Sequence, residues 1–547
     1  MPRVALVHAP HVLAQAFRDL GCDVVLDLRP EGGELDISQE LADAAPDLFL
    51  QTEVLGQRTL LRGQENLPCP TLFWAIDPHL NGFWQAAYGR LFDLTLSTQA
   101  RWREDLAALG ADVAHLPWFG LARPWKPWES RSHEICFVGR VTAQRPARGW
   151  LLDFLTRHFG GRATLAADVA FSQMFELYGD SRLAPNESIM GELNFRLFEA
   201  ASAGCLVLGR DLGPAQAELF EPGREMEVFD HVAGLKALLD GLLQNPRAAQ
   251  AKARAAWEKV QAAHLPAHRA QRILDLAQAL PRKRAQGGDA ALQHGLARYR
   301  LWEAGRWPVP AQDMARMLDS LPASPLARAA RLRFLVQCPG LEAQATAALA
   351  ALWRETPAAR DLDADLAGSL GGLRLGQWEL AQGFWLARLK TLKQPSKTLL
   401  EPPAQPKDLL RLWARLLREA GRLLRPGFPF DPAAHVPDCA AECLFQALHL
   451  APGDVEILRE IDGLLAACPG QEQMRVGFLS DLTLRQRNDW RLALSLGLAS
   501  LACFRLEAGL EELASARDLA RKQGKEQAFL RALGARDPGG LLAKTLP

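Results

Sequence analysis

An alternation of short apolar strands with helices over the first half of the chain constrains the fold more than any other feature of the sequence. Val4–His8, Asp23–Leu28 and Thr71–Ile76 have the length and apolar character of buried strands, and His11–Leu20 has helical spacing. Strands that alternate with helices are typical of βαβ units around a parallel sheet. The Gly-x-Gly-x-x-Gly fingerprint of dinucleotide-binding domains does not follow the first strand.

Two breaks divide this pattern. Residues 119–132 hold two prolines and two tryptophans, which predicts a stiff linker. Residues 281–289 are polar and contain glycine, and only helical patterns follow them. We therefore predict an α/β fold of two doubly wound, Rossmann-like domains followed by an all-α region. The predicted parts are an N-terminal domain (1–118), a linker (119–132), a second α/β domain (133–280), a linker (281–289) and a helical domain (290–547).

Local patterns predict further elements of the α/β part. They are a helix at Ser38–Ala45, a loop at Asp77-Pro78-His79, a helix at Gln99–Leu109, a strand at Glu134–Arg140, a turn between Leu177 and Asn186, and a strand at Cys205–Leu208.

The helical part contains segments that resemble degenerate tetratricopeptide repeats. Leu373–Ala381 has a Gly-x-Trp-x-x-Ala pattern, Glu303–Trp307 echoes it, and Ala447–Asp454 has the form of a helix end and the turn into the next helix. Such repeats have a period of about 34 residues. A helical solenoid or bundle without true repeats is the alternative.

The composition excludes one class of partner and indicates a compartment. The 63 basic residues balance 63 acidic residues, so the basic excess of nucleic-acid-binding proteins is missing. The nine cysteines contain no Cys-x-x-Cys pair, which favours reduced thiols in a cytoplasmic protein. No apolar run reaches the roughly 18 residues of a membrane span, and the first strand is too short for a signal peptide. Abundant Arg, Ala and Leu beside few Lys and Tyr indicate a GC-rich bacterial genome.

The stretch from Asn186 to Leu208 is the most informative part of the sequence. A polar loop leads into a helix with apolar residues at helical spacing, Gly204 ends that helix, and a buried strand follows. Arg196 and Glu199 lie three positions apart on this helix. They form either a surface ion pair or a cation and a carboxylate at a helix N-terminus, where phosphates bind readily.

Three segments share the order and spacing of the motifs of one known family. They are Glu134–Arg145 with Phe137, Val138, Gly139, Arg140 and Arg145; Asn186–Gly204 with Asn194, Arg196, Glu199 and Ala200; and Leu219–Glu225 followed by His264 and Arg269. On these residues, roughly 1–280 of the chain resembles the CgeB-like branch of the GT-B glycosyltransferases. The resemblance implies a GT-B arrangement of two Rossmann-like domains, with the acceptor on the N-terminal side and a nucleotide sugar in the second domain.

The resemblance also implies roles for the charged residues. Glu199 would accept hydrogen bonds from the ribose hydroxyls. Arg196, with Arg140 or Arg145, would meet the diphosphate, because a guanidinium can bind phosphate oxygens in a bidentate manner. Gly139 would let the backbone approach the donor closely. No cofactor beyond the donor is expected, and no metal, because GT-B chemistry stabilises the leaving diphosphate with arginines and a helix dipole.

Two asparagines in the central stretch have alternative roles. Asn194 either contacts the donor or caps the helix that follows it. Asn186 either contacts the sugar or holds a turn. Arg145 is either a phosphate ligand or a solvated side chain.

The catalytic residue is open between three candidates. Asp77 follows a predicted central strand and would be the base that deprotonates an acceptor hydroxyl in an inverting transfer, or it caps the next helix. His8 ends the first strand and is the second candidate, or an ordinary loop residue. Many retaining GT-B enzymes carry an acidic residue eight positions before the ribose-binding glutamate; here that position is Gly191, and Glu192 is one residue away. Retention therefore does not follow from the sequence.

We thus expect a glycosyltransferase that acts on a glycan or protein acceptor, with a helical region that binds the acceptor or a protein partner. The alternatives are a non-catalytic interaction protein with a degenerate GT-B unit and a GT-B-shaped nucleotide-sugar epimerase.

Overall fold

The computed structural model describes all residues except 42–43, 55, 57, 102–110, 144 and 547. The helix predicted over Gln99–Leu109 therefore lies largely outside the described residues. Within the described part of the chain, no helix has both the length and the apolar character needed to cross a membrane. Contacts group the chain into two compact units, Met1–Leu116 with Ala270–Ile461, and Pro117–Arg269 with Asp462–Pro547.

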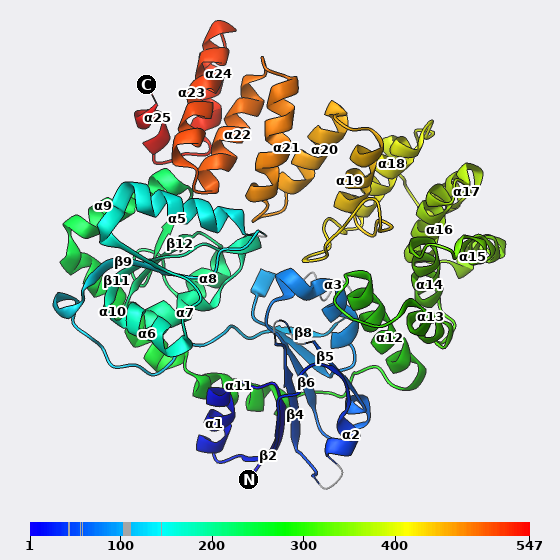
Figure 1. The fold of residues 1–547 in the computed structure, drawn as a ribbon, viewed down its shortest axis with the longest axis horizontal. Helices are drawn as coiled ribbons and strands as arrows, with labels where there is room; N and C mark the ends of the chain where they lie inside the picture. The colour runs from blue at the N-terminus through cyan, green and yellow to red at the C-terminus, as the bar shows by residue number, and fades with distance from the viewer. Residues whose placement is uncertain (42–43, 55, 57, 102–110, 144, 547) are drawn as a thin grey trace. The chain divides into compact units, whose positions relative to one another are not determined.

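The first unit contains a parallel sheet of six strands in the order β2-β1-β4-β6-β7-β8, and β3 pairs with β5 in a separate two-stranded sheet (Figure 1). The strands are β1 (Arg3–Val7), β2 (Asp23–Leu28), β3 (Gly33–Asp36), β4 (Leu48–Thr52), β5 (Thr59–Arg62), β6 (Thr71–Ala75), β7 (Leu94–Ser97) and β8 (Val113–His115). Helices α1 (His11–Asp19), α2 (Ile37–Glu40) and α3 (Pro78–Gly89) lie between strands in the chain. Because β1, β4 and β6 are parallel neighbours, the residues that follow them meet at one edge of the sheet.

Helices from the C-terminal half complete the first unit. They are α12 (Gly287–Glu303), α13 (Ala311–Asp319), α14 (Pro325–Gln337), α15 (Glu342–Arg354), α16 (Leu362–Arg374), α17 (Trp378–Thr391), α18 (Pro406–Glu419) and α19 (Ala440–Leu450). α12 packs beside α3 (Figure 1). Tyr299 and Leu301 of α12 share one buried core with Phe73 and Tyr88. The sheet and these helices therefore exclude water from a common core.

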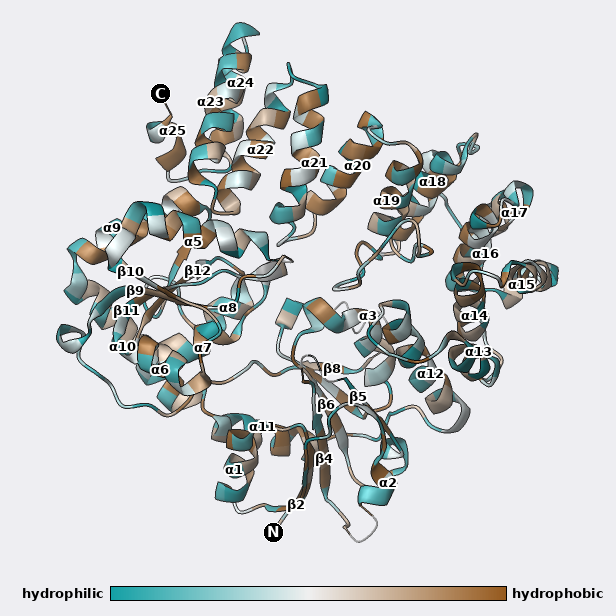
Figure 2. Ribbon diagram, viewed as in Figure 1, coloured by the Kyte–Doolittle hydropathy of each residue, from teal (hydrophilic) through white to brown (hydrophobic). Residues whose placement is uncertain are grey.

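The second unit contains a parallel sheet of five strands in the order β10-β9-β11-β12-β13. Its strands are β9 (His133–Val138), β10 (Ala163–Ala166), β11 (Ser181–Pro185), β12 (Leu206–Arg210) and β13 (Glu227–Phe229), and its helices are α5 (Pro146–Phe159), α6 (Phe171–Gly179), α7 (Phe195–Ser202), α8 (Pro214–Leu219), α9 (Val232–Gln244) and α10 (Pro246–Ala263). Figure 2 shows largely hydrophobic strands and helices with mixed faces around them. Leu206 and Leu208 are fully buried, as the predicted strand over Cys205–Leu208 requires.

The last helices of the chain belong to this second unit. They are α21 (Glu472–Arg485), α22 (Trp490–Ala502), α23 (Leu506–Lys522), α24 (Glu526–Gly534) and α25 (Leu541–Thr545). α22 and α25 both pack on α9. Leu501 and Leu513 share a buried core with Leu235 and Leu239. The unit boundaries fall within α11 (Pro266–Gln278) and α20 (Val455–Ala466).

The structure confirms two parallel sheets with their helices, followed by an all-helical part, and the contacts divide the helices of that part between the two compact units. The sequence-based domain limits and the tetratricopeptide-like character of the helices stay predictions.

Three local assignments are wrong. The region between Leu177 and Asn186 contains β11 rather than only a turn, because Ser181–Pro185 pairs with β9 and β12 in the middle of the sheet. The residues predicted as a loop at Asp77-Pro78-His79 include the start of α3, since Pro78 occupies its first turn. The helix predicted from Ser38 ends at Glu40.

The segment 281–289, predicted as a linker, is anchored to the first sheet by a buried cation. The Arg284 guanidinium lies 2.9 Å from the Asp93 carboxylate, and both side chains are almost fully buried. The same guanidinium donates to the Cys69 carbonyl (3.1 Å) and to the Thr71 hydroxyl (2.9 Å). The segment therefore holds a fixed position on the sheet.

We expect Arg284→Met to lower the free energy of unfolding by about 3 kcal/mol, because it leaves the buried Asp93 carboxylate without its cation. Lys283→Met is the matched control: its ammonium is exposed, lies 3.5 Å from Asp112, and should contribute less than about 1 kcal/mol. Urea denaturation followed by circular dichroism measures both variants. Equal losses in the two variants would contradict the anchoring role.

Candidate functional site

The residues predicted to bind a donor come from neighbouring loops at one edge of the second sheet. β9, β11 and β12 are parallel neighbours, so Gly139, Asn186 and the residues after Arg210 follow strand ends that meet at this edge. Asn194 precedes α7, which carries Arg196 and Glu199. The parallel pairing therefore brings together loops that are far apart in the sequence.

The Arg196 guanidinium is held by protein acceptors. Its Nε and Nη2 donate to the Val138 carbonyl (3.2 and 2.9 Å), and its Nη1 donates to Asn186 Oδ1 (2.7 Å). The guanidinium also lies over the Phe137 ring, 4.4 Å from the centroid. Arg196 is 7% exposed. The reading of Arg196 and Glu199 as a surface ion pair is therefore wrong.

The structure shows why position 139 holds a glycine. A Cβ atom at Gly139 would lie 2.6 Å from Arg196 Nη2 and 3.1 Å from the Phe137 ring. Any side chain would push the guanidinium away from the end of β9. The absence of a side chain at position 139 thus serves the protein's own packing.

Asn194 precedes α7 but does not cap it. Its side chain makes no capping hydrogen bond. Instead, its Nδ2 donates to Asn186 Oδ1 and to the Glu187 carbonyl, both at 2.8 Å. Asn194 Oδ1 is buried and has no partner in the described structure. Asn186 therefore accepts from both Arg196 and Asn194, and joins β11 to α7.

Glu199 differs from its neighbours because no hydrogen bond or ion pair of its carboxylate occurs within the described residues. Burial raises the pKa of Glu199 to about 7, and the nearby Arg196 opposes this rise. The side chain is partly exposed. A carboxylate in this state has unused acceptor capacity.

The two remaining arginines have different surroundings. Arg140 is 72% exposed and pairs with Asp168 at 2.7 Å. Arg145 is 23% exposed and lies 3.8 Å from the Glu192 carboxylate, whose own side chain is buried. Arg145 therefore has an acidic neighbour rather than solvent alone, and the structure brings it together with Glu192.

A buried ion pair that was not predicted from the sequence lies beside these residues. Arg148 of α5 lies 2.8 Å from the Glu187 carboxylate, with the two side chains 6% and 4% exposed. Arg148 Nη1 also donates to the Arg140 carbonyl (2.8 Å). The partners are 39 residues apart, so no local pattern could identify them.

The first sheet, which belongs to the first unit, has its own polar edge. Glu53 follows β4 and was not predicted as a site residue. Its Oε2 accepts hydrogen bonds from the backbone amides of Ile76 (2.8 Å) and Asp77 (3.0 Å), and from Gln85 Nε2 (2.6 Å). Burial and the charge of Asp77 raise the pKa of Glu53 to about 7. Glu53 therefore holds the loop that carries Asp77.

Asp77 and His8 lie at this edge. Asp77 occupies the position before α3 but makes no capping hydrogen bond, so its interpretation as a helix cap is wrong. His8 has a positive φ of 58°, and its Nε2 lies 2.8 Å from the Thr59 hydroxyl. Burial, with Arg29 nearby, lowers the pKa of His8 and favours its neutral form.

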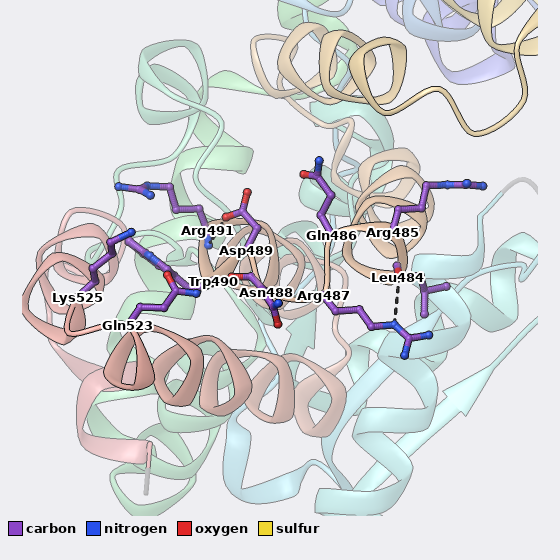
Figure 3. A pocket seen from close by; sticks show the side chains of 10 residues that line it. All are labelled: Leu484, Arg485, Gln486, Arg487, Asn488, Asp489, Trp490, Arg491, Gln523 and Lys525. Atoms are coloured by element: carbon purple, nitrogen blue, oxygen red, sulfur yellow. Dashed lines mark hydrogen bonds between the residues drawn. The ribbon is translucent and has the colours of Figure 1, made fainter.

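A polar pocket of about 550 Å³ lies in the helical part of the second unit (Figure 3). It is lined by the loop between α21 and α22 and by Gln523 and Lys525. Arg485 and Arg487 extend to one side, and Arg491 and Lys525 to the other. These cations do not converge on one point, so the pocket is a poor match for a single anionic ligand.

The Glu199 carboxyl predicts a pH dependence of stability. Its pKa is raised from 4.5 to about 7, so between these values the folded protein binds more protons than the unfolded chain, and the free energy of unfolding falls as pH rises. Glu199→Gln removes this titration. We expect the variant to gain about 1 to 3 kcal/mol relative to the wild type between about pH 4.5 and 7. Urea denaturation at a series of pH values measures it, with the exposed Glu176→Gln as control. A constant difference between Glu199→Gln and the wild type across this range would contradict the raised pKa.

Comparison with known proteins finds a similarity over the second sheet. A family described as glycosyl transferase-like matches residues 129–275. The match spans β9 to β13 and includes Arg196, Glu199 and their partners. No curated protein matches the chain.

Several solved structures resemble part of the chain at low sequence identity. HepE from Anabaena, in complex with UDP-glucose, is 11% identical with a TM-score of 0.36, over 51% of this chain and 100% of that chain. Sucrose-phosphate synthase from Thermosynechococcus elongatus is 11% identical with a TM-score of 0.37, over 51% of this chain and 98% of that chain. The pneumococcal O-GlcNAc transferase GtfA, in complex with UDP and GlcNAc, is 12% identical with a TM-score of 0.32, over 42% of this chain and 56% of that chain.

The edge of the second sheet, with Arg196 and Glu199 on α7, thus lies within residues 129–275, the stretch that is similar to a family described as glycosyl transferase-like.

Proposed function

We propose that this protein is a glycosyltransferase that moves a sugar from a nucleotide-sugar donor to an acceptor hydroxyl. The observation that carries the proposal is the glycosyl transferase-like match of residues 129–275, which contains a carboxylate with unused acceptor capacity at the carboxyl edge of a parallel sheet. Ligands of doubly wound sheets bind at this edge. We also propose that the protein belongs to the CgeB-like branch and that its two α/β domains have a GT-B arrangement.

The donor would be held by a carboxylate and by a positive environment. Glu199, once ionised, accepts hydrogen bonds from two ribose hydroxyls, because a carboxylate is an acceptor only. Three of the five N–H groups of Arg196 donate to Val138 and Asn186, and we propose that the other two bind a phosphate oxygen. Arg140 and Arg145 add positive charge, and the N-terminus of α7 adds its backbone dipole. The diphosphate would thus be stabilised without a metal.

Asn186 and Asn194 would act together. Asn186 Oδ1 accepts hydrogen bonds from Arg196 and Asn194, so this oxygen stabilises the protein's own structure. Asn194 Oδ1 has no partner in the described structure and is the better candidate for a sugar hydroxyl.

The base of an inverting transfer would come from the first sheet. We favour Asp77, because Glu53 fixes its backbone amide and its carboxylate is 10% exposed. His8 is the second candidate, since a neutral imidazole can accept a proton. Glu192 stays a third. The acceptor would be a glycan or a protein, and the helices would bind it or a protein partner.

We expect a nucleotide sugar to raise the melting temperature of the wild-type protein, and Glu199→Ala to remove most of this rise. The physical reason is the loss of the ribose acceptor, which should weaken donor binding at least tenfold, or about 1.4 kcal/mol. A thermal-shift screen with UDP, GDP, dTDP and ADP sugars measures it. Glu176→Ala, which removes an exposed helical glutamate of the same unit, is the matched control. No shift with any donor would favour the non-catalytic interaction protein, and formation of an epimer without acceptor would favour the epimerase.

We expect Asp77→Asn to lower the turnover of the donor at least 100-fold while the donor dissociation constant changes less than about threefold, because general-base catalysis contributes about 10² to 10⁴. Release of the nucleoside diphosphate measures turnover, and titration calorimetry measures binding. Asp112→Asn, an exposed aspartate of the same unit, is the control. Wild-type turnover in Asp77→Asn would exclude Asp77 and direct attention to His8.

A further inference from the structure

A glycine in the C-terminal helical part packs on the predicted donor-site loop. Gly470 lies in the turn between α20 and α21 and has a φ of +78°. A Cβ atom at this position would lie 2.5 Å from the Gly191 nitrogen and closer still to the Cα and carbonyl carbon of Met190. Backbone therefore packs directly on backbone, a contact that only glycine permits.

The contacted loop has an unusual conformation. Met190 has a φ of 51° and a ψ of 25°, and the next residue, Gly191, has a φ of 71°. Two consecutive left-handed residues are uncommon, and a left-handed methionine is strained. Strain of this kind persists only where the surrounding structure enforces it. The Gly470 turn is part of that surrounding structure.

This loop carries or leads into the donor-site residues. Asn186 and Glu187 precede Met190, and Asn194, Arg196 and Glu199 follow it. A movement of Met190 would displace the Asn194 amide, which bonds to Asn186 and Glu187. The hydrogen bonds between Asn186 and α7 would change with it.

Two further contacts of the C-terminal helices reach neighbouring segments of this sheet edge. Gln473 Oε1 of α21 accepts from the Ala147 amide (3.3 Å), at the start of α5. Arg210 at the end of β12 donates to the Ala502 carbonyl (2.9 Å) at the end of α22. The segment from residue 462 onward therefore contacts the start of α5, the loop that follows β11 and the end of β12.

We infer that the Gly470 turn is a positioning element of the donor site: it holds Met190 and Gly191 in the left-handed conformation, so the C-terminal helices set the geometry in which Asn194 and Glu199 meet a nucleotide sugar. The inference rests on the proposed donor-binding function. One part of the inference does not depend on a substrate: the C-terminal helices hold residues 186–194 in a fixed conformation.

Gly470→Ala tests this inference against a closely matched control. Gly524 also has a positive φ, +66°, and a Cβ atom there would meet nothing within 4 Å. Gly524→Ala therefore introduces the same kind of backbone strain in the same helical segment without touching the loop. We expect Gly470→Ala to weaken binding of the nucleotide sugar found in the thermal-shift screen at least tenfold, and Gly524→Ala to leave it within twofold.

Hydrogen exchange gives a readout that needs no ligand. In the full chain, the peptide covering residues 186–194 should exchange faster in Gly470→Ala than in Gly524→Ala, while the peptides of β9 and β12 stay protected in both. Unchanged exchange together with unchanged donor affinity would overturn the inference. If the wild type binds no nucleotide sugar, the proposed function fails, and the exchange experiment still decides the role of Gly470.

Gln473→Ala is the second variant, in case Gly470→Ala does not fold. It removes the acceptor of the Ala147 amide without a backbone clash, and we expect a three- to tenfold loss of donor affinity. Gln523→Ala, whose side chain donates to the Asn488 carbonyl in the pocket at the other end of α21, is its control. Equal affinities of these two variants would overturn the wider claim that the C-terminal helices position the site.

Discussion

The geometry of the polar edge of the second sheet depends on the buried guanidinium of Arg196. A buried cation is tolerated only when its N–H groups find acceptors. Here the acceptors are the Val138 carbonyl at the end of β9 and the Asn186 amide at the end of β11, while the cation itself belongs to α7. One side chain therefore joins two neighbouring strand ends to the helix that carries Glu199. Three N–H groups of Arg196 are directed to Val138 and Asn186 in this way, and within the described residues Glu199 keeps its acceptor capacity for a ligand.

The helices of the C-terminal half take part in both sheets' polar edges, each within its own unit. In the second unit the Gly470 turn packs on Met190 and Gly191. In the first unit Gly427, with a φ of +70°, packs in the same way on the backbone of Leu80, three residues after Asp77. In both cases a glycine of the helical region, in a conformation that other residues rarely adopt, permits the approach. In each unit, the helical region therefore packs against backbone near the polar edge of the sheet.

Much of the fold and part of the site could be predicted from local patterns. The strands around Val4–Val7 and Leu206–Leu208 are continuous apolar runs, and the Arg196–Glu199 helix has a clear apolar face. β11 was not predicted because its sequence contains Ser181, Arg182 and Pro185 and therefore lacks an apolar pattern. Its burial comes from its central position in the sheet. Glu53 and the Arg148–Glu187 pair were not predicted as site residues, because each residue is distant in the sequence from the partner that it meets at the sheet edge.

The sequence by itself determined the parallel α/β character of the first half, the helical character of the second, and the stretch that contains Arg196 and Glu199, because periodicity and motif spacing are local properties of the chain. Only the tertiary structure decided which acceptors hold Arg196, that Asn194 bonds to Asn186 instead of capping α7, and that the C-terminal helices touch Met190. These are contacts between residues brought together by parallel strand pairing, and no local pattern records which strand ends become neighbours.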